Sequence, residues 1–277
     1  MKLFKNDQTA YLEKDGNWYS KKTDWDVLIN RKGLHDFLQK DLPNWQTLKA
    51  NPPLGMDPPI GNQEIWAAGV TYLRSKEARM EEAKEAGGGD FYDRVYEAER
   101  PEIFFKATAA RTVGSGDVVN IRKDSTWNVP EPELTLFCSS EGTIEGYTIG
   151  NDMSSRSIEG ENPLYLPQAK TYERSAGLGP CLYIPGQPIP KTTIIKMEIF
   201  RDNDKMFEDQ VAISQMKRGL EELSHFLFRE CNFPFGCFLM TGTCLVPDDS
   251  FTLQVGDKIV IQIAGIGKLI NFVGTRK

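Results

Sequence analysis

From Ile103 to the end of the chain, short runs of β-branched and aromatic residues alternate with clusters of Gly, Asp and Pro. Such runs are typical of strands separated by turns. One longer stretch, AISQMKRGLEELSHFLFREC (212–231), instead repeats its apolar residues at helical spacing. Because strands follow one another with few helices between them, the pattern favours an α+β fold with a mixed sheet and disfavours parallel βαβ winding.

The N-terminal quarter of the sequence has a different pattern. Residues 1–47 contain strand-like pieces with a turn at Asp15-Gly16, and then a predicted helix in GLHDFLQKDL (33–42). The following stretch, NPPLGMDPPIGNQ (51–63), is dense in Pro and Gly and is typical of a linker. We therefore predict a small N-terminal α/β domain over residues 1–60 and a main domain over residues 61–277.

The main domain opens with a predicted buried strand, EIWAAGVTY (64–72). Helix formers then fill LRSKEARMEEAKEAGGG (73–89), and a second short helix is expected in DFYDRVYEAERPE (90–102), ending before Pro101. A charged helix and a glycine hinge between two strands are typical of a lid over an active site. The alternative is a solvated surface helix with a flexible loop.

Composition and charge exclude several classes of function. The 277 residues carry a net charge of -6 with Lys and Arg dispersed, which gives no electrostatic footprint for nucleic acid. The five cysteines form no CxxC pair, so a zinc site is not indicated and a reducing compartment is expected. No run approaches the ~18 apolar residues of a membrane span, and no signal-peptide run is visible. These features predict a cytoplasmic protein.

Candidate chemistry begins in WNVPEPELTLF (127–137), where Glu131 and Glu133 stand two residues apart in a strand-like run. Side chains at this spacing lie on the same face of a strand. Two carboxylates there indicate either a solvated edge strand or a buried pair around a cation. Asp152 ends another apolar run, and Lys170 lies in NPLYLPQAK (162–170). Oxygen ligands without nearby His or Cys suit Mg²⁺ or Mn²⁺.

Several motifs, in order, resemble the fumarylacetoacetate hydrolase superfamily: RPEIFFKAT, PEPEL, GYTIGNDMSSR, EGENPLYLPQAK and TGTCLVP. The resemblance covers roughly residue 64 to the C-terminus. It implies a mixed β-sandwich roll, usually dimeric, that binds a small 2-oxo acid. It also implies Glu131, Glu133 and Asp152 as ligands of Mg²⁺ or Mn²⁺, Lys170 facing the substrate, and the Thr241–Thr243 turn, through Thr243, binding the substrate carboxylate.

One departure from the family pattern decides which reaction we expect. Hydrolytic members carry a His–Glu dyad that activates water, and Ser75 and Ala78 stand at those two positions here. This departure disfavours hydrolysis and favours elimination, and the resemblance then implies dehydration of a 2-keto-3-deoxy sugar acid through an enolate that the metal stabilises. The alternatives are hydrolytic C–C cleavage of an acylpyruvate or fumarylacetoacetate-type diketo acid, decarboxylation of a 2-oxo acid, and a relative that binds a ligand without catalysis.

Two assignments of the general base remain open from the sequence. Either Lys170 removes the C3 proton, or Lys170 neutralises charge and a glutamate, Glu77 or Glu102, is the base. Three further residues are candidates for substrate binding in this interpretation: Arg74, Lys106 and Gln168. Arg74 could equally be a solvated residue of the charged helix, and Lys106 could belong to a buried ion pair.

Overall fold

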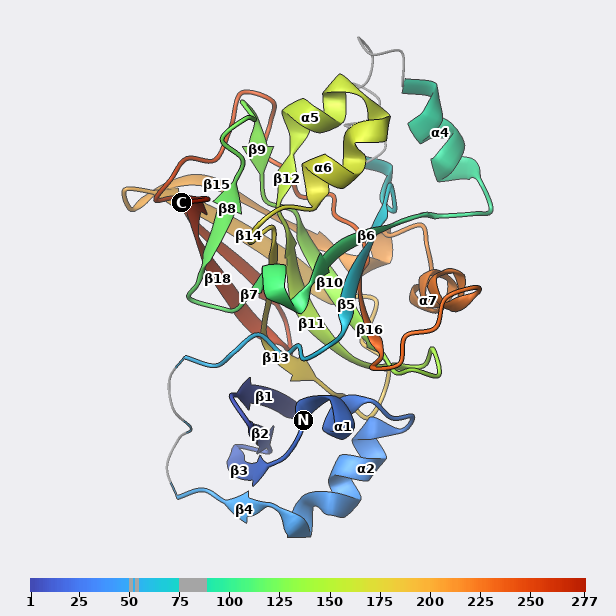
Figure 1. The fold of residues 1–277 in the computed structure, drawn as a ribbon, viewed down its shortest axis with the longest axis vertical. Helices are drawn as coiled ribbons and strands as arrows, with labels where there is room; N and C mark the ends of the chain where they lie inside the picture. Colours follow the sequence, from blue (N-terminus) through green and yellow to red (C-terminus); the bar gives the residue numbers. More distant parts are fainter. Residues whose placement is uncertain (50–51, 53–54, 75–88) are drawn as a thin grey trace.

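The computed structural model describes residues 1–49, 52, 55–74 and 89–277 (Figure 1). Within these ranges, eleven strands form one large sheet in the hydrogen-bonded order β4-β3-β2-β1-β13-β11-β10-β16-β5-β6, with β7 beside β13. Its strands are β1 (Lys2–Asn6), β2 (Thr9–Lys14), β3 (Asn17–Lys22), β4 (Gln46–Thr47), β5 (Glu64–Gly69), β6 (Glu102–Thr108), β7 (Thr112–Val113), β10 (Pro132–Cys138), β11 (Ile144–Asp152), β13 (Ala176–Tyr183) and β16 (Cys237–Met240).

A second sheet packs against the large one. Its five described strands follow the order β15-β14-β17-β18-β8, and a small separate pair joins β9 to β12. The strands are β8 (Val118–Ile121), β9 (Asn128–Val129), β12 (Ser154–Ser155), β14 (Ile194–Arg201), β15 (Asp204–Ala212), β17 (Lys258–Ile263) and β18 (Gly267–Thr275). Both antiparallel and parallel pairs occur, which confirms the predicted mixed sheet.

The helices of the described residues are short; α4, α5 and α6 lie at one end of the molecule, and α1 and α2 lie beside the N-terminal strands at the other (Figure 1). Near the N-terminus are α1 (Trp25–Ile29), α2 (Leu34–Asp41) and the 3₁₀ turn η1 (Leu42–Asn44). Later in the chain are α4 (Gly89–Glu97), η2 (Ala109–Arg111), α5 (Arg156–Glu161), η3 (Pro163–Tyr165), α6 (Leu166–Lys170), η4 (Ile213–Gln215) and α7 (Leu220–Phe228). The predicted helix over 73–89 falls mostly on residues 75–88, which lie outside the described ranges.

The two faces of the large sheet bury two separate cores. On β10, Leu134 and Leu136 point into the cluster shared with the second sheet, where they meet residues such as Ile195 and Ile259. Phe137 points the other way, into a cluster shared with the N-terminal strands and helices. Strand β10 is therefore buried on both faces, and only paired or hydrogen-bonded polar groups are tolerated there.

The N-terminal part continues the large sheet because Lys2 and Leu3 of β1 pair with Tyr183 and Leu182 of β13. The predicted turn at Asp15-Gly16 is confirmed: both residues have positive φ, 51° and 78°, as a two-residue type I′ hairpin requires. The boundary between residues 60 and 61 stays a prediction.

One helix is shorter than its sequence pattern indicated. The stretch 212–231 was expected to be a single helix, but α7 begins only at Leu220. Gly219 has extended backbone angles, and its N–H donates to the carboxylate of Glu222, which caps the helix start. The residues before it are held elsewhere, since Met216 forms a β-bridge with Tyr72.

Two expectations from composition can be compared with the fold. All five cysteines lie in the described part of the chain and are free thiols, and Cys231 alone among them is exposed. None of the helices in the described ranges is long and apolar enough to span a membrane.

We predict that Asp41 stabilises the N-terminal part through its ionised form. Its partial burial would raise its pKa, but hydrogen bonds from Asn44, Lys21 and Trp45 outweigh this effect and hold the pKa below its usual value. Asp41→Asn should lower the free energy of unfolding by about 2 kcal/mol at pH 7, measured by urea denaturation.

The pH dependence of the free energy of unfolding tests whether the ionised form of Asp41 is the stabilising one. A carboxyl whose pKa is lower in the folded state stabilises above its unfolded pKa of about 3.9 and loses that contribution as pH falls through the folded value. The gap between wild type and Asp41→Asn should therefore narrow below about pH 4. Asp36→Asn, at an exposed position of the same helix, is the control and should change little. A gap that is constant down to pH 2 would contradict the assignment.

Candidate active site

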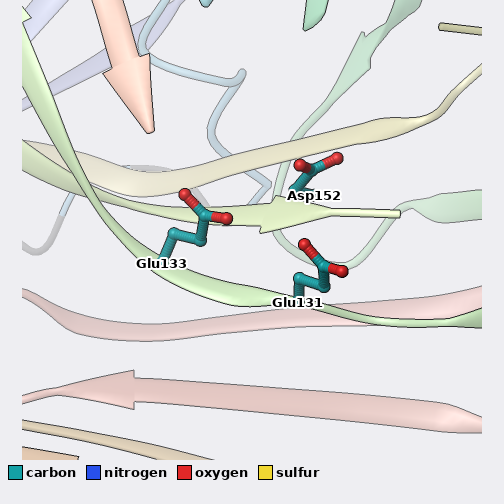
Figure 2. Close-up of side chains that lie close together, drawn as sticks. All are labelled: Glu131, Glu133 and Asp152. Carbon is teal, nitrogen blue, oxygen red and sulfur yellow. The ribbon is translucent and has the colours of Figure 1, made fainter. Parts of the chain in front are cut away.

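Three carboxylates meet where β10 and β11 run side by side. Glu131 and Glu133 extend from the start of β10, and Asp152 ends the antiparallel neighbour β11 (Figure 2). The Asp152 N–H donates to the carbonyl of Glu131 at 2.9 Å, which brings the two strand ends together. One carboxylate oxygen from each residue lies within 4.8 Å of the others. We call these three residues the carboxylate centre.

The alternative of a solvated edge strand is wrong. Strand β10 lies between β11 and β16, and Glu131, Glu133 and Asp152 are 3%, 1% and 1% exposed. The two-residue spacing puts Glu131 and Glu133 on the face opposite Leu134 and Leu136, as the strand period requires. The pair is thus buried, and three anions this close need compensating positive charge.

Three cationic side chains supply that charge. The Lys170 ammonium lies 2.8 Å from Glu131 Oε2 and 3.2 Å from Asp152 Oδ2, and it donates to Ser154 Oγ at 2.5 Å. Arg156 Nη2 donates to Glu131 Oε1 at 2.8 Å. Lys106 Nζ lies 2.5 Å from Asp152 Oδ1. Among the described residues, Glu131 and Asp152 therefore form direct ion pairs with these cations, and Glu133 does not.

The local sequence explains how Arg156 and Lys170 come to lie beside the carboxylates. After β11 the chain turns through β12 into α5, which begins at Arg156. Asn162 caps the next turn by accepting from the Leu164 N–H, and proline lies in the first turn of both η3 and α6. Proline favours the first turn of a helix because its φ is fixed and its missing N–H has no partner there anyway. Helix α6 then ends at Lys170, over the carboxylates.

Glu133 shows the electrostatic strain of the centre most clearly. Burial raises its pKa well above the usual value, and repulsion from Asp152 and Glu131 adds to the increase. A hydrogen bond from the Gly242 N–H, 2.6 Å from Glu133 Oε2, and the nearby charge of Lys170 act in the opposite direction and lower the pKa. The ionised form of such a carboxyl is strongly stabilised by a nearby cation, because the cation offsets both the repulsion and the desolvation cost.

Sequence reasoning missed two members of the site, Arg156 and Glu159. Glu159 is 3% exposed, and its carboxylate oxygens lie 3.4 Å from Lys170 Nζ and 3.6 Å from Arg156 Nε. The two residues are three apart on α5, so they share one helix face. A paired Arg and Glu at this spacing, directly after the strand that ends in Asp152, was the available signal.

Lys106 lies in a buried ion pair, the alternative that the sequence left open beside a substrate-binding role. It is fully buried, and burial lowers its pKa while Asp152 counteracts the decrease. Its ammonium contacts Asp152 and also donates to the carbonyls of Met153 and Lys170, at 2.9 and 2.5 Å. An ammonium has three donors, so none is left for a ligand. Lys106 instead fixes Asp152 and the end of α6 from behind.

Two other substrate-binding candidates lie away from the centre. Arg74 Nη1 pairs with Asp209 at 2.8 Å on the exposed surface. The Gln168 side chain is exposed, and its backbone carbonyl accepts from Arg122. Neither lines the space at the carboxylates. Their roles in substrate binding stay predictions.

The remaining predicted residues have different outcomes. Thr243 lines the space at the carboxylates, beside Gly242. Glu102 pairs across the β5–β6 ladder with Gly69, and its carboxylate covers the open side of that glycine, which also lines the space. Glu77, Ser75 and Ala78 lie outside the described residues. The roles of Lys170, Glu102 and Thr243 stay predictions.

The donor set fits a small hard cation. Carboxylate oxygens are the ligands that Mg²⁺ and Mn²⁺ prefer, and all three here are buried and close enough to share one ion. The space they line together with Lys170, Arg156 and Thr243 measures about 20 Å³. That volume holds one water or one ion, because a water needs about 10–15 Å³ by the same measure.

The fold and this centre define a family. The Fumarylacetoacetate (FAA) hydrolase C-terminal family matches residues 64–274, and the chain belongs to that family. The probable 2-keto-3-deoxyxylonate dehydratase of Haloferax volcanii is 49% identical over 218 residues, 78% of this chain and 74% of the relative. The 2-dehydro-3-deoxy-D-arabinonate dehydratase of Saccharolobus solfataricus is 41% identical over 221 residues, 79% and 74% of the two chains.

Solved structures agree with these relatives. A hexagonal crystal form of 2-keto-3-deoxyarabinonate dehydratase superposes with a TM-score of 0.87 at 33% identity, over the full length of both chains. A 2-keto-3-deoxy-D-arabinonate dehydratase complexed with magnesium and 2,5-dioxopentanoate gives 0.83 at 32% identity, again over both full lengths. The predicted fold class is confirmed: this is the mixed β-sheet fold of the fumarylacetoacetate hydrolase family.

Glu133→Gln should separate metal affinity from folding. The amide keeps an oxygen for the Gly242 N–H but cannot carry the ligand charge, so we expect the Mg²⁺ dissociation constant to rise at least about tenfold in calorimetric titration. Glu141→Gln, at an exposed position of the β10–β11 hairpin, is the control and should bind like wild type. Unchanged affinity in Glu133→Gln would remove Glu133 from the ligand set.

The same variant tests the raised pKa of Glu133 without metal. A carboxyl with a raised folded pKa binds more protons folded than unfolded, so its contribution to stability is complete below the unfolded pKa of about 4.3 and is lost as pH rises. In chelator, the free energy of unfolding of Glu133→Gln relative to wild type should therefore increase between about pH 5 and pH 8. A difference in unfolding free energy that does not change with pH would contradict the raised pKa of Glu133.

Proposed function

We propose that this protein is a Mg²⁺-dependent dehydratase of a 2-keto-3-deoxy sugar acid. The observation that carries the proposal is the buried carboxylate centre, in a chain 49% and 41% identical to two proteins named as dehydratases of this class. Hydrolytic C–C cleavage of a diketo acid and decarboxylation are the second candidates, because they require the same loss of a proton or carbon next to a 2-oxo group. The names of the relatives favour dehydration.

Glu131, Glu133 and Asp152 would hold the ion, with Mn²⁺ as an alternative to Mg²⁺. A magnesium complex of a protein 32% identical to this one supports the choice. Bound there, Mg²⁺ would stabilise the negative charge that develops on the oxygens of a 2-oxo acid. Lys106 and Arg156 keep Asp152 and Glu131 oriented, since each pairs with one carboxylate oxygen.

The proposed reaction removes water across C3 and C4 and then isomerises the product. A base takes the C3 proton, and the C4 hydroxyl leaves with a proton as water, which gives a 3,4-unsaturated 2-oxo acid. In a substrate with a C5 hydroxyl, loss of a C5 proton and protonation at C3 then give the C4–C5 enol, and its tautomerisation gives a dioxo acid. The 2,5-dioxopentanoate in the complex of the similar dehydratase is a product of this type. The chain must therefore supply a proton acceptor near C3 and a proton donor near C4.

Two described residues can share these tasks. Lys170 Nζ is within 3.4 Å of three carboxylates and carries protons at the edge of the centre. The Glu102 carboxylate lies against Gly69, at the neighbouring wall of the same space. Either residue could be the base, with the other as acid or charge-neutralising partner. Thr243 on the same wall is proposed to bind the substrate carboxylate.

The direct test is ¹H NMR of 2-keto-3-deoxy sugar acids in D₂O with Mg²⁺. We expect deuterium at C3, and a dioxo acid as the product, because proton removal at C3 precedes loss of the hydroxyl. Addition of EDTA should stop both processes. Release of pyruvate would instead indicate C–C cleavage. If none of the 2-oxo acids tested is converted, that result would contradict an enzymatic function.

Lys170→Met and Glu102→Gln distinguish the base from its partner. Each should lower kcat by about 10²–10⁴-fold, the usual contribution of a positioned acid or base. The variant that lacks the base should also lose C3 exchange in D₂O, whereas the other should retain exchange and lose elimination. Lys170→Met should still bind Mg²⁺ by calorimetry, because all three carboxylates remain. Lys268→Met, an exposed lysine of β18, is the control.

Gly69→Ala provides a gentler change at the same wall. An added Cβ would overlap the Glu102 carboxylate, which can swing away because it is the end of a flexible side chain. We expect normal folding, retained Mg²⁺ binding and a lower kcat. Wild-type kcat in Gly69→Ala together with inactive Glu102→Gln would show that the observed place of the carboxylate is not the working one.

A homodimer and a cytoplasmic location complete the proposal. They rest on the resemblance to the family and on the composition of the chain. Size-exclusion chromatography with light scattering of the full chain tests the first, and a molar mass near 31.3 kDa would contradict it.

A further inference from the structure

A second hollow lies outside the carboxylate centre and shares no lining residue with it. It measures about 550 Å³. Arg122 and Lys123 at the end of β8, Arg111 at the end of η2 and the C-terminal Arg276 contribute cationic side chains, and Tyr172 and Glu173 form part of its wall. We call this feature the basic hollow.

The topology brings these charges together from distant parts of the sequence. Strands β8 and β18 pair in parallel, with Ile121 opposite Thr275, so the residues that follow each strand leave the sheet side by side. This places Arg122 and Lys123 next to Arg276. The concentration of positive charge is therefore a consequence of strand register, in a chain whose net charge is -6.

Most of this positive charge is not neutralised by the described residues. Arg122 is bound bidentately by Asp124, at 2.8 and 2.6 Å. For Arg111, Lys123 and Arg276, by contrast, the described residues provide no hydrogen bond or ion pair. Four cations face only two lining carboxylates, those of Asp124 and Glu173. Like charges gathered around a concave surface attract an anion, and guanidinium groups bind phosphate or carboxylate oxygens in pairs.

The wall of the basic hollow is also the continuation of the active-site helix. Thr171, Tyr172 and Glu173 directly follow Lys170. Arg122 Nη1 donates to the carbonyl of Gln168 at 3.1 Å, and Asn120 Nδ2 donates to the carbonyl of Glu173 at 3.0 Å. Residues on both sides of Lys170 are thus held by side chains that line this hollow.

We propose that the basic hollow binds a small, multiply charged oxyanion, such as a phosphate monoester, at a site separate from the carboxylate centre. The volume lies in the range of about 300–1,000 Å³ typical of small-molecule sites. Arg111, Lys123 and Arg276 would contact the anion, and Arg122, already oriented by Asp124, would border it. The bound anion would lie against the segment that continues from Lys170.

The test is calorimetric titration of the full-length, metal-free protein with inorganic phosphate, pyrophosphate and citrate, each at one ionic strength set with NaCl. We expect saturable binding of at least one of them. In the double variant R111Q/R276Q the dissociation constant should rise at least about tenfold, because two charged contacts are lost. K191Q/K268Q, which removes the same net charge from exposed sites elsewhere, is the matched control and should bind like wild type.

The outcomes are distinguishable from one another. Phosphate or pyrophosphate bound more tightly than citrate would identify phosphate esters as the ligand class, and the reverse order would identify polycarboxylates. The proposal is overturned by the absence of saturable binding, by an equal loss in both double variants, or by binding that R111Q/R276Q leaves intact. It is also overturned if R111Q/R276Q only changes the oligomeric state. The binding test requires no enzymatic activity, so it stands or fails independently of the proposed dehydration.

Discussion

Mutual repulsion among three buried carboxylates is the constraint on which the site depends. Glu131, Glu133 and Asp152 lie within 4.8 Å of one another with almost no exposure to water. Removing one partner from a buried ion pair typically costs about 3–5 kcal/mol, because the remaining charge is left without compensation. The cations around the centre are therefore part of the fold. Among the described residues, Glu133 has the backbone N–H of Gly242 as its direct partner, whereas Glu131 and Asp152 pair with cations.

The sheet provides the anions, and the segment that follows it provides most of the cations. Strand β10 is held between β11 and β16, so its register is fixed on both sides, and the two-residue period directs Glu131 and Glu133 away from the core that Leu134 fills. The chain then leaves β11 at Asp152 and returns through two short helices over the same point. Ligands on strands and charges on helix ends thus come from one continuous stretch, roughly residues 128–170.

That continuity explains which parts of the site the sequence could predict. The spacing of Glu131 and Glu133, and Asp152 at the end of an apolar run, are local patterns with a single geometric meaning. The family resemblance added the expectation that Lys170 faces the substrate. The sequence could not decide between a buried ion pair and a site-facing role for Lys106, because its partners, Asp152 and two backbone carbonyls, are far from it in sequence. Arg156 and Glu159 were missed because a short polar helix gives no periodic signal of burial. The length of α7 was overestimated because the apolar period also covers residues 212–219, whereas the helix begins only after Gly219.

Counting charge around the centre connects it to an acidic substrate. Four buried carboxylates, those of the centre and of Glu159, face three cations, Lys106, Arg156 and Lys170, which leaves one net negative charge when all are ionised. Such a site alone would repel a sugar acid. With a divalent ion the same count becomes one net positive charge, and a single substrate carboxylate neutralises it. Without Glu159 the count with the ion would be two positive charges, which favours tight retention of acidic substrate and product alike. Glu159 does not belong to the three carboxylates that are close enough to share one ion, but its carboxylate lies 3.4 Å from Lys170 Nζ. Its negative charge therefore lowers the net positive charge that surrounds a bound ion.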